Sequence, residues 1–507
     1  MKRILVIAGS DSSGGAGLEA DQKVIAAHGC YAMTATTALT AQNTQGVYGI
    51  HETPSDFVQK QIDACVEDIG VDVVKTGMLA SAATVAVVAD TLRKYGIKHS
   101  VVDPVMVATS GAKLLPENAI RILCEKLLPE TFIVTPNIPE ANLILKESGR
   151  PAIEISDLEG MKQLAAAVRE LGSKYVLLKG GHLPLTAERK VAKSDSDKKL
   201  VVNVLIGDDV EEVVELAYQE SRNTHGTGCT LASAIACNLA QGASVSKAVR
   251  MASRYVEAAI KTSVGLGKGS GPVNHFHSLQ ALPFAPGGFI EYLLDREDVK
   301  PVWHGYTHHK FVQGLGDGTL PPERFKEYMT QDYLYLKVHF ARANALAGYK
   351  AKTLDDIAMA AQIVTHVRHE INLHIEECKE FGLTQEDLEK CEESQACTAY
   401  TRYVLDIGQS EDWLALQVSL LPCLLGYGVI ARRLHDLQAT HPPKEPNRYL
   451  TWINNYIGDD YNAAMEKGSA LIEKHAKKQS PSRVEELAAI FIHATKMETG
   501  FWNMASA

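Results

Sequence analysis

The spacing of apolar residues changes near residue 280, and this change constrains the fold more than any other feature of the chain. Before it, short apolar runs that end in polar or glycine residues alternate with amphipathic stretches such as 82–95 and 158–171. This alternation is typical of βα units. The first half is therefore predicted to be an α/β domain, with a central, mainly parallel sheet flanked by helices. Its strands are expected at 4–8, 73–75, 100–103, 132–135 and 175–179.

After residue 290 the short apolar runs give way to long segments with a helical period, which predict an all-α domain. The segment 278–290 between the two halves contains SLQALPFAPGGF, with two prolines, two glycines and no periodicity, and is predicted to be a linker. The domains are accordingly expected at 1–277 and 291–507. The helical segments are 322–346, 354–381, 397–407, 411–437, 447–476 and 481–504.

Composition excludes several classes of protein. The chain has 507 residues, which is more than a single core usually holds, and its 46% apolar and 22% charged residues are ordinary for a globular protein. With 61 acidic and 51 basic side chains the net charge is −10, which argues against a broad basic face for nucleic acid. No run of 18 apolar residues occurs, so no membrane span is predicted.

The N-terminus and the cysteines favour a cytoplasmic protein. The apolar run in MKRILVIAGSDSSGG is too short for a signal peptide and is better interpreted as a first strand. The nine cysteines, scattered from Cys30 to Cys423 without a CxxC pair, fit a reducing compartment and not a disulfide framework or a zinc site.

Two glycine-rich turns are candidates for ligand binding. The first, Gly9–Gly17 (GSDSSGGAG), follows the first predicted strand, although a tight βα turn needs glycine for structural reasons alone. The second, Asn223–Thr230 (NTHGTGCT), opens an apolar helix, and backbone N–H groups at such a position form an anion hole. The helix dipole would lower the pKa of a thiol at Cys229. The alternative is a glycine turn with a buried cysteine.

Polar residues follow several predicted strands. Asp103 precedes Pro104, Asn137 and Glu140 lie in TPNIPE, and Lys179 lies in LLKGGH. Carboxylates and an amide at a sheet edge suit Mg²⁺ bound together with phosphates, and a lysine there can neutralise a triphosphate. The chain has no GxxxxGK[ST] motif, so a P-loop ATPase is not expected. The charged segment 189–200 is predicted to be a solvated loop or a flap over this site.

Residues 1–277 resemble the hydroxymethylpyrimidine and hydroxymethylpyrimidine-phosphate kinases of the ribokinase superfamily. The motifs are GSDSSGGAGLEAD, TALTAQNTQGV, KTGML, VVDPVM, TPNIPEA, LLKGGH, NTHGTGCTLASAIA and GKGSGPVNHFH. The resemblance implies a pyrimidine pocket lined by Asp21, Gln42 and Met78. It implies that ATP phosphates and Mg²⁺ are served by Asp103, Asn137, Glu140 and Lys179, with Glu140 as the candidate metal ligand. It also implies an anion hole formed by Gly226, Thr227, Gly228 and Cys229.

Cys229 stands where most ribokinase relatives have an aspartate base. If one site phosphorylates first an alcohol and then the resulting monoester, a fixed carboxylate would repel the second, anionic acceptor. A cysteine tolerates both acceptors, which is our hypothesis for its presence.

The second half holds three polar groups within apolar helices. Cys423 follows Pro422, which is expected to break the hydrogen-bond ladder and expose the thiol, although a buried free cysteine is usually inert. Glu498 in KMETGFW would have a raised pKa if buried, as a general acid requires, and Asp332 in TQDYLYL has a similar setting. The helically spaced His366, His369, Glu370 and His374 could hold a metal or serve a structural role.

Residues 290–507 resemble thiaminase II, a helical TenA-like protein of the haem-oxygenase-like fold. The motifs are FVQGLGDGTLPPERFKEYMTQDYLYL, TAYTRYVL, SLLPCLLGYG, YLTWINNY and METGFWNMA. The resemblance implies that Cys423 is the nucleophile, that Glu498 moves the proton, and that no metal or organic cofactor takes part. It further implies that Asp332 binds the ring nitrogen and amino group, that Tyr400 and Tyr427 orient the thiol and water, and that Tyr335 and Tyr456 pack around the ring.

The two resemblances together imply one pathway. The helical domain would hydrolyse thiamine or its aminopyrimidine degradation products to hydroxymethylpyrimidine, and the kinase domain would phosphorylate that product twice with ATP. The expected partners are these small molecules, with no nucleic acid and no membrane, and a homo-oligomer is expected because both families assemble. The alternative is a pyridoxal-kinase-like activity with a non-catalytic helical domain for ligand binding or oligomerisation.

Overall fold

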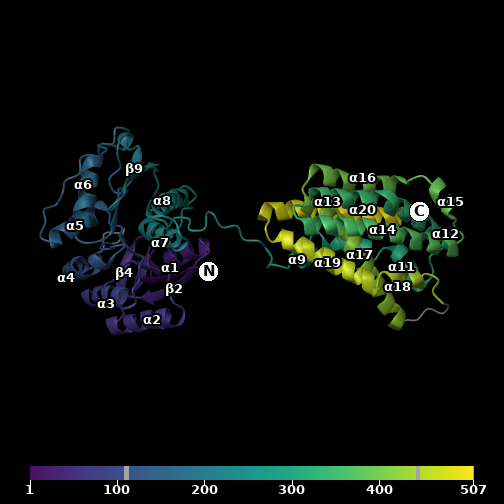
Figure 1. Ribbon diagram of the computed structural model, residues 1–507, viewed down its shortest axis with the longest axis horizontal. Helices are drawn as coiled ribbons and strands as arrows, with labels where there is room; N and C mark the ends of the chain where they lie inside the picture. The colour runs from purple at the N-terminus through teal and green to yellow at the C-terminus, as the bar shows by residue number, and fades with distance from the viewer. Residues whose placement is uncertain (108–113, 441–445, 506–507) are drawn as a thin grey trace. The chain divides into compact units, whose positions relative to one another are not determined.

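The chain folds into two compact units, which the computed structural model describes over residues 1–107, 114–440 and 446–505. The units are Met1–Leu279 and Gln280–Ala507 (Figure 1), so their boundary lies two residues after the predicted end of the first domain. Helix α9 (Phe289–Asp295) begins inside the predicted linker. Its Phe289 and Leu293 are buried in the core of the second unit, which explains why the helix starts earlier than predicted.

The first unit is built on an eight-stranded sheet in the order β10-β9-β8-β7-β6-β5-β1-β2. Six neighbouring strands of this sheet pair in parallel: β8, β7, β6, β5, β1 and β2. Strands β9 and β10 form an antiparallel edge that the sequence prediction omitted. Strands β3 and β4 form a separate antiparallel hairpin. The strands are β1 (Arg3–Ala8), β2 (Tyr31–Thr36), β3 (Ala38–Asn43), β4 (Gly46–Glu52), β5 (Val73–Thr76), β6 (Ser100–Val102), β7 (Ile133–Val134), β8 (Tyr175–Lys179), β9 (Leu200–Ile206) and β10 (Glu211–Ala217).

Helices cover both faces of this sheet, as predicted. In β1, Leu5 and Ile7 point into one apolar cluster while Ile4 and Val6 point into the other, because successive strand side chains alternate between faces. One face is covered by α1 (Gly17–Ala27), α7 (Thr227–Ala240) and α8 (Val245–Lys261). The other is covered by α2 (Ser55–Asp68), α3 (Ala82–Lys94), α4 (Glu117–Ile122), α5 (Ile138–Glu147) and α6 (Leu158–Arg169).

The short turns complete the first unit. Helix α4 continues into a π-helical turn, η1 (Leu123–Leu127), and a 3₁₀ turn, η2 (Leu128–Glu130). The charged segment before β9 is a loop with one 3₁₀ turn, η3 (Asp195–Asp197), and isolated bridges join Leu185 to Val191 and Leu200. The predicted loop is therefore present, and its role as a flap stays a prediction.

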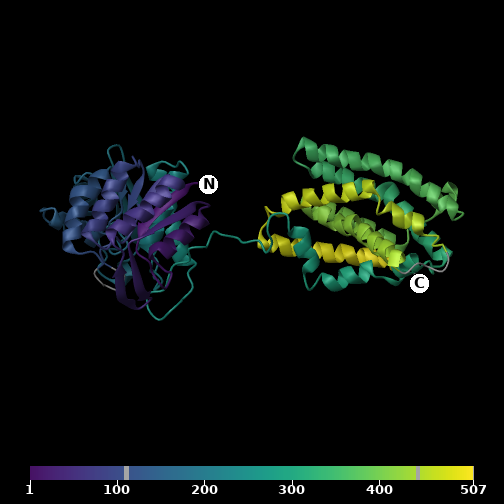
Figure 2. The same cartoon turned by 90° about the horizontal axis from the view of Figure 1, so that it is seen from below.

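The second unit is all helical, as predicted. Its long helices are seen from below in Figure 2. The segment predicted as one helix over 447–476 contains two, because the chain turns at Tyr456 and is extended at Gly458 before a new helix begins with two aspartates. The helices are α10 (Lys300–Thr307), α11 (Lys310–Asp317), α12 (Pro322–Leu334), η4 (Tyr335–Phe340, π-helical), α13 (Ala341–Lys350), α14 (Leu354–Glu380), α15 (Gln385–Lys390), α16 (Gln395–Ser410), α17 (Trp413–Thr440), α18 (Leu450–Asn455), α19 (Asp459–Ala476) and α20 (Pro481–Met504).

Helix α17 is the central helix of this unit. It continues through Pro422, so the predicted interruption does not end the helix, and it packs against α11, α16, α19 and α20. An 18-residue window has a mean hydropathy of 1.9, enough by length and composition to cross a membrane, but 78% of that window is buried inside the unit. These contacts identify α17 as the core helix of the bundle, and Cys423 on this helix is partly buried.

Candidate functional sites

A cavity of about 690 Å³ opens at the carboxyl ends of the parallel strands in the first unit. Its walls include Ser10 after β1, Met78 after β5, Asp103 after β6, Asn137 after β7 and Lys179 at the end of β8. Ligands of open α/β sheets bind at this edge. The strand-end residues that the sequence predicts to act together therefore share one cavity.

Lys179 links the charged residues of this cavity. Its Nζ donates a hydrogen bond of 2.6 Å to Asp103 Oδ1 and lies 3.9 Å from Glu140 Oε2. Burial alone would lower the pKa of Lys179, but the charges of Asp103 and Glu140 outweigh burial and raise it. Burial, together with Asp103, raises the pKa of Glu140 to about 7, although Lys179 opposes the shift. Asn137 and Glu140 also form a capping box at the start of α5.

The second glycine turn forms the N-terminus of α7 beside this lysine. Gly226 caps the helix with a φ of +82°, and a β-carbon there would overlap the carbonyl oxygen of Gly15, so only glycine fits. A β-carbon on Gly228 would lie 3.4 Å from Lys179 Nζ and 3.5 Å from Asp103 Oδ2. The first N–H groups of a helix have no intrahelical acceptor. The helix end and the lysine therefore face the same space, as an anion hole requires.

The structure corrects the prediction for the thiol of Cys229. The sequence predicts a lowered pKa at the helix N-terminus, but burial raises the pKa of Cys229 to about 12. The charge of Lys75 opposes this shift, while Asp21 and Asp103 strengthen it. Desolvation and two nearby carboxylates outweigh the helix dipole, so Cys229 is a neutral thiol at neutral pH.

The structure also corrects the prediction for Asp21. Gln42 and Met78 line the cavity as predicted, whereas Asp21 is fully buried outside the cavity wall. Both its oxygens accept from Lys75 Nζ at 2.8 Å, and Oδ1 accepts from Ser233 at 2.7 Å. Position 21 is on the inward face of α1, where a buried carboxylate is tolerated only if an opposite charge is paired with it. Asp21 therefore holds Lys75 beneath the site.

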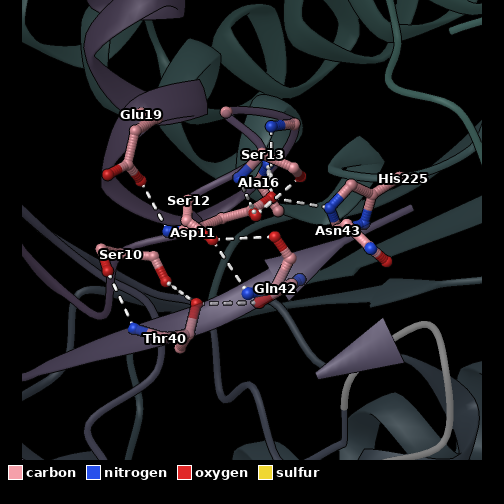
Figure 3. A network of polar contacts seen from close by, with 12 residues as sticks. Ser10, Asp11, Ser12, Ser13, Ala16, Glu19, Thr40, Gln42, Asn43 and His225 are labelled. Atoms are coloured by element: carbon pink, nitrogen blue, oxygen red, sulfur yellow. Dashed lines mark hydrogen bonds and ion pairs between the residues drawn. The ribbon is translucent and has the colours of Figure 1, made fainter. Parts of the chain in front are cut away.

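Sequence reasoning missed a network around Asp11 and His225 (Figure 3). His225 Nε2 lies 2.7 Å from Asp11 Oδ2, and the Asp11 carboxylate also accepts from Ser13 Oγ and from the amides of Gly15 and Ala16. Burial would raise the pKa of Asp11, but the hydrogen bonds from His225 and Ser13 hold it well below its usual value. Both residues lie in motifs that the sequence analysis names, but they are 214 residues apart, so the sequence does not reveal their contact.

The network joins the two glycine turns and the hairpin that carries Gln42. Ser12 Oγ donates to the Gln42 carbonyl at 2.8 Å and accepts from the Gln42 amide at 2.9 Å. His225 immediately precedes Gly226. Asp11 and its neighbour Ser12 therefore fix the position of the cavity wall at Gln42 relative to the anion hole at Gly226.

We predict that Asp11→Asn loosens the first glycine turn. The neutral amide loses the charge-assisted bonds, each worth about 1.5–3 kcal/mol. The amides of Gly15 and Ala16 should then exchange with solvent at least tenfold faster, as measured by amide hydrogen exchange. Ser13→Ala, which removes only one hydroxyl donor, should have a smaller effect. Equal protection in Asp11→Asn and the unmodified chain would contradict this account.

The second unit buries Glu498 in the middle of α20. Its carboxyl is 1% exposed and accepts a 2.7 Å hydrogen bond from the Tyr400 hydroxyl on α16. Burial raises the pKa of Glu498 to about 8, the charge of Asp332 adds to the shift, and hydrogen bonds from Tyr400 and Tyr427 oppose it. The upward shift agrees with the sequence prediction. Glu498 is therefore mostly protonated at neutral pH and can donate a proton.

Aromatic rings surround this carboxyl. Tyr335 stacks on Tyr400 with ring centroids 5.2 Å apart, and the ring centroids of Tyr427 and Tyr456 are 5.0 Å apart. After burial, the charges of Cys423 and Glu498 contribute most to the raised pKa of Tyr335, so the thiol and the carboxyl share this environment. The structure thus gathers the predicted residues, and their roles stay predictions. Sequence reasoning missed further rings around the site, although three of the motifs contain them: Tyr328, Trp452, Phe501 and Trp502.

Asp332 lies at the end of α12, before the π-helical turn η4. It is 6% exposed, and its Oδ2 lies 3.7 Å from His374 Nδ1. His374 Nε2 lies 2.9 Å from the Met329 carbonyl, which supports a structural role for this histidine. The side chains of His369 and Glu370 lie outside the described residues. Among the side chains that are described, no group of three potential metal ligands occurs.

We predict that Glu498 makes stability depend on pH. Its folded pKa of about 8 exceeds the unfolded value of about 4.3, so the folded chain binds more protons between these values. The contribution is full below the unfolded pKa and is lost as pH rises through the folded pKa. The free energy of unfolding of the second unit, measured with urea, should fall by up to about 1.4 kcal/mol for each pH unit in this window.

The matched variants are Glu498→Gln, which should flatten the pH dependence, and Glu466→Gln at an exposed position, which should not. A slope that is unchanged in Glu498→Gln would rule out the assigned titration.

Comparisons with known proteins match both units. Residues 11–274 match the family model described as phosphomethylpyrimidine kinase, and residues 296–507 match the TENA/THI-4/PQQC family. A putative hydroxymethylpyrimidine/phosphomethylpyrimidine kinase 2 of Schizosaccharomyces pombe is 46% identical, covering 98% of this chain and 90% of that protein. A hydroxymethylpyrimidine/phosphomethylpyrimidine kinase of Saccharomyces cerevisiae is 35% identical, covering 99% and 95%. A solved phosphomethylpyrimidine kinase from Clostridium difficile 630 is 38% identical, with a TM-score of 0.43, covering 51% of this chain and 100% of that one.

Proposed function

The chain belongs to the phosphomethylpyrimidine kinase family and carries a C-terminal domain of the TENA/THI-4/PQQC family, and on this basis we propose that it makes and salvages the pyrimidine half of thiamine diphosphate. The first unit transfers phosphoryl groups from ATP to 4-amino-5-hydroxymethyl-2-methylpyrimidine and then to its monophosphate. The second unit hydrolyses thiamine or its aminopyrimidine degradation products to hydroxymethylpyrimidine. The kinase proposal rests above all on the helix end at Gly226–Gly228 facing Lys179 and Asp103 in one cavity.

The cavity supplies positive partners for a triphosphate. Lys179 exchanges its bond with Asp103 for phosphate oxygens, and the amides at the start of α7 receive the charge that develops on the transferred group. The donor set fits Mg²⁺ carried by ATP, because such an ion needs one or two carboxylates besides phosphates and water. Asp103 and Glu140 would hold it, and the bound ion would neutralise charge on the triphosphate.

The neutral thiol of Cys229 supports one site for both phosphorylations. With a pKa of about 12, it does not repel an incoming monoester. The alcohol, in turn, needs little help from a base, because its proton is lost late in a loose transition state. Positioning and the anion hole then serve both steps.

We predict that Cys229→Asp separates the two steps. A carboxylate can accept the alcohol proton but repels the anionic monoester, so the second phosphorylation should fall at least tenfold more than the first. Initial rates with hydroxymethylpyrimidine and with its monophosphate measure the two steps. The neutral Cys229→Ser is the matched control and should change both steps alike. Equal losses in Cys229→Asp would contradict the hypothesis.

In the second unit Cys423 adds to the pyrimidine ring, and Glu498 gives its proton to the ring. The exocyclic substituent then leaves and water takes its place. The protonated Glu498 in a dry, aromatic site supports this proposal, because an ionised carboxylate could not act as the acid. Asp332 binds the ring nitrogen and amino group, and Tyr335 and Tyr456 pack around the ring. Tyr400 and Tyr427 orient the thiol and the water.

The pyridoxal-kinase-like alternative is not favoured. Relatives that cover nearly the whole chain are named hydroxymethylpyrimidine/phosphomethylpyrimidine kinases. The gathering of Cys423, Glu498 and the tyrosines also argues against a helical domain that only binds or assembles. A homo-oligomer in the cytoplasm that contacts neither nucleic acid nor membrane remains part of the proposal.

We predict that the intact chain converts an aminopyrimidine or thiamine, together with Mg-ATP, to pyrimidine mono- and diphosphates, as followed by chromatography. Cys423→Ser should stop this conversion but leave phosphorylation of added hydroxymethylpyrimidine intact. Lys179→Met should accumulate unphosphorylated hydroxymethylpyrimidine. Failure of the intact chain to release hydroxymethylpyrimidine from either substrate would refute the hydrolase, and failure to phosphorylate it would refute the kinase.

A further inference from the structure

Tyr306 on α10 carries a buried hydroxyl that the mechanism above does not use. The residue is fully buried, and its hydroxyl oxygen has no hydrogen-bond partner among the described residues. A buried hydroxyl without a partner costs free energy, because it has lost its bonds to water. Phenylalanine would fill the same space without that cost, so the hydroxyl points to a partner that arrives with a ligand.

The Tyr306 side chain lies between the turns that carry Cys423 and Glu498. Gly426 follows Cys423 by three residues on α17, so the two share one face of the helix. A β-carbon at 426 would lie 2.5 Å from the Tyr306 hydroxyl oxygen. On the other side, the Tyr306 ring stacks on Trp502 with an interplanar angle of 14°, and Trp502 follows Glu498 by one turn of α20.

The electrostatic surroundings agree with this position. Burial raises the pKa of Tyr306 well above its usual value, and the charges of Glu498 and Cys423 are the next largest causes. The hydroxyl therefore keeps its proton and offers both a donor and an acceptor beside the two groups that carry out the chemistry. Gly426 leaves the room that this placement needs.

We propose that the Tyr306 hydroxyl binds the exocyclic amine of an aminomethylpyrimidine substrate and thereby favours amines over thiamine. This inference rests on the proposed hydrolysis. Asp332 is assigned to the ring nitrogen and amino group and Glu498 to protonation of the ring, which leaves the exocyclic substituent for Tyr306. In the overall reaction a C–N bond breaks and a C–O bond forms: water gives its hydroxyl to the methylene carbon and its proton to the departing amine, which leaves as ammonia.

The two substrate classes differ in what they offer this hydroxyl. An aminomethyl nitrogen carries N–H groups that the tyrosine oxygen accepts. The thiazolium nitrogen of thiamine is quaternary, with neither an N–H group nor a lone pair, so it forms no hydrogen bond. Removing the hydroxyl should therefore slow hydrolysis of the amine and leave hydrolysis of thiamine nearly unchanged.

The experiment compares Tyr306→Phe with the unmodified chain on 4-amino-5-aminomethyl-2-methylpyrimidine and on thiamine. We expect kcat/KM for the amine to fall at least tenfold, kcat/KM for thiamine to stay within about threefold, and the unfolding temperature to stay the same or rise. In a Cys423→Ser background, which cannot turn over, calorimetry should show weaker binding of the amine and unchanged binding of thiamine. Tyr403→Phe, which removes a half-buried hydroxyl bonded to the Ile490 carbonyl, is the matched control and should change neither substrate.

An unchanged rate with the amine, or equal losses on both substrates, would overturn the inference, since equal losses indicate a packing role. A chain that hydrolyses neither substrate before any substitution would instead overturn the proposed function, and this inference with it.

Discussion

The partner available to each buried carboxyl group determines what the two units can do. A carboxylate removed from water remains ionised only if a cation or several donors lie beside it. In the first unit Asp21 has Lys75, Asp103 has Lys179, and Asp11 has His225 with four further donors. In the second unit Glu498 has only hydroxyl partners among the groups that shift its pKa. Three buried aspartates of the first unit are therefore paired with basic side chains, whereas Glu498 has no basic side chain among the groups that shift its pKa, which burial raises to about 8.

This difference matches the two chemistries. Phosphoryl transfer needs fixed charges and donors around an anion, and the paired lysines and the end of α7 supply them at the sheet edge. Hydrolysis at an aromatic ring needs a proton source in a dry site, and a neutral carboxyl enclosed by tyrosine and tryptophan rings supplies it. Cys229 in the first unit is a neutral thiol, and Cys423 in the second unit is the proposed nucleophile.

The sequence predicts the architecture well because the spacing of apolar residues directly reflects which side chains are buried. Both halves have the predicted class, and the strand-end residues Asp103, Asn137 and Lys179 share one cavity because parallel strands end at one edge. Groups whose behaviour depends on neighbours distant in sequence were predicted poorly. Asp21 is paired with Lys75, and desolvation at Cys229 outweighs the helix dipole. Tyr306 lies in VWHGYTHH without any pattern that marks it, since only the folded bundle places it between Cys423 and Glu498.

The protonation state of Glu498 tests this account most directly. Infrared difference spectra between the intact chain and Glu498→Gln, recorded across a pH series, isolate the signal of this carboxyl. The account predicts a protonated carboxyl at pH 7 that loses its proton near pH 8. A carboxylate signal from Glu498 already dominant at pH 7 would contradict it, because burial without a cation would then not keep the acid neutral.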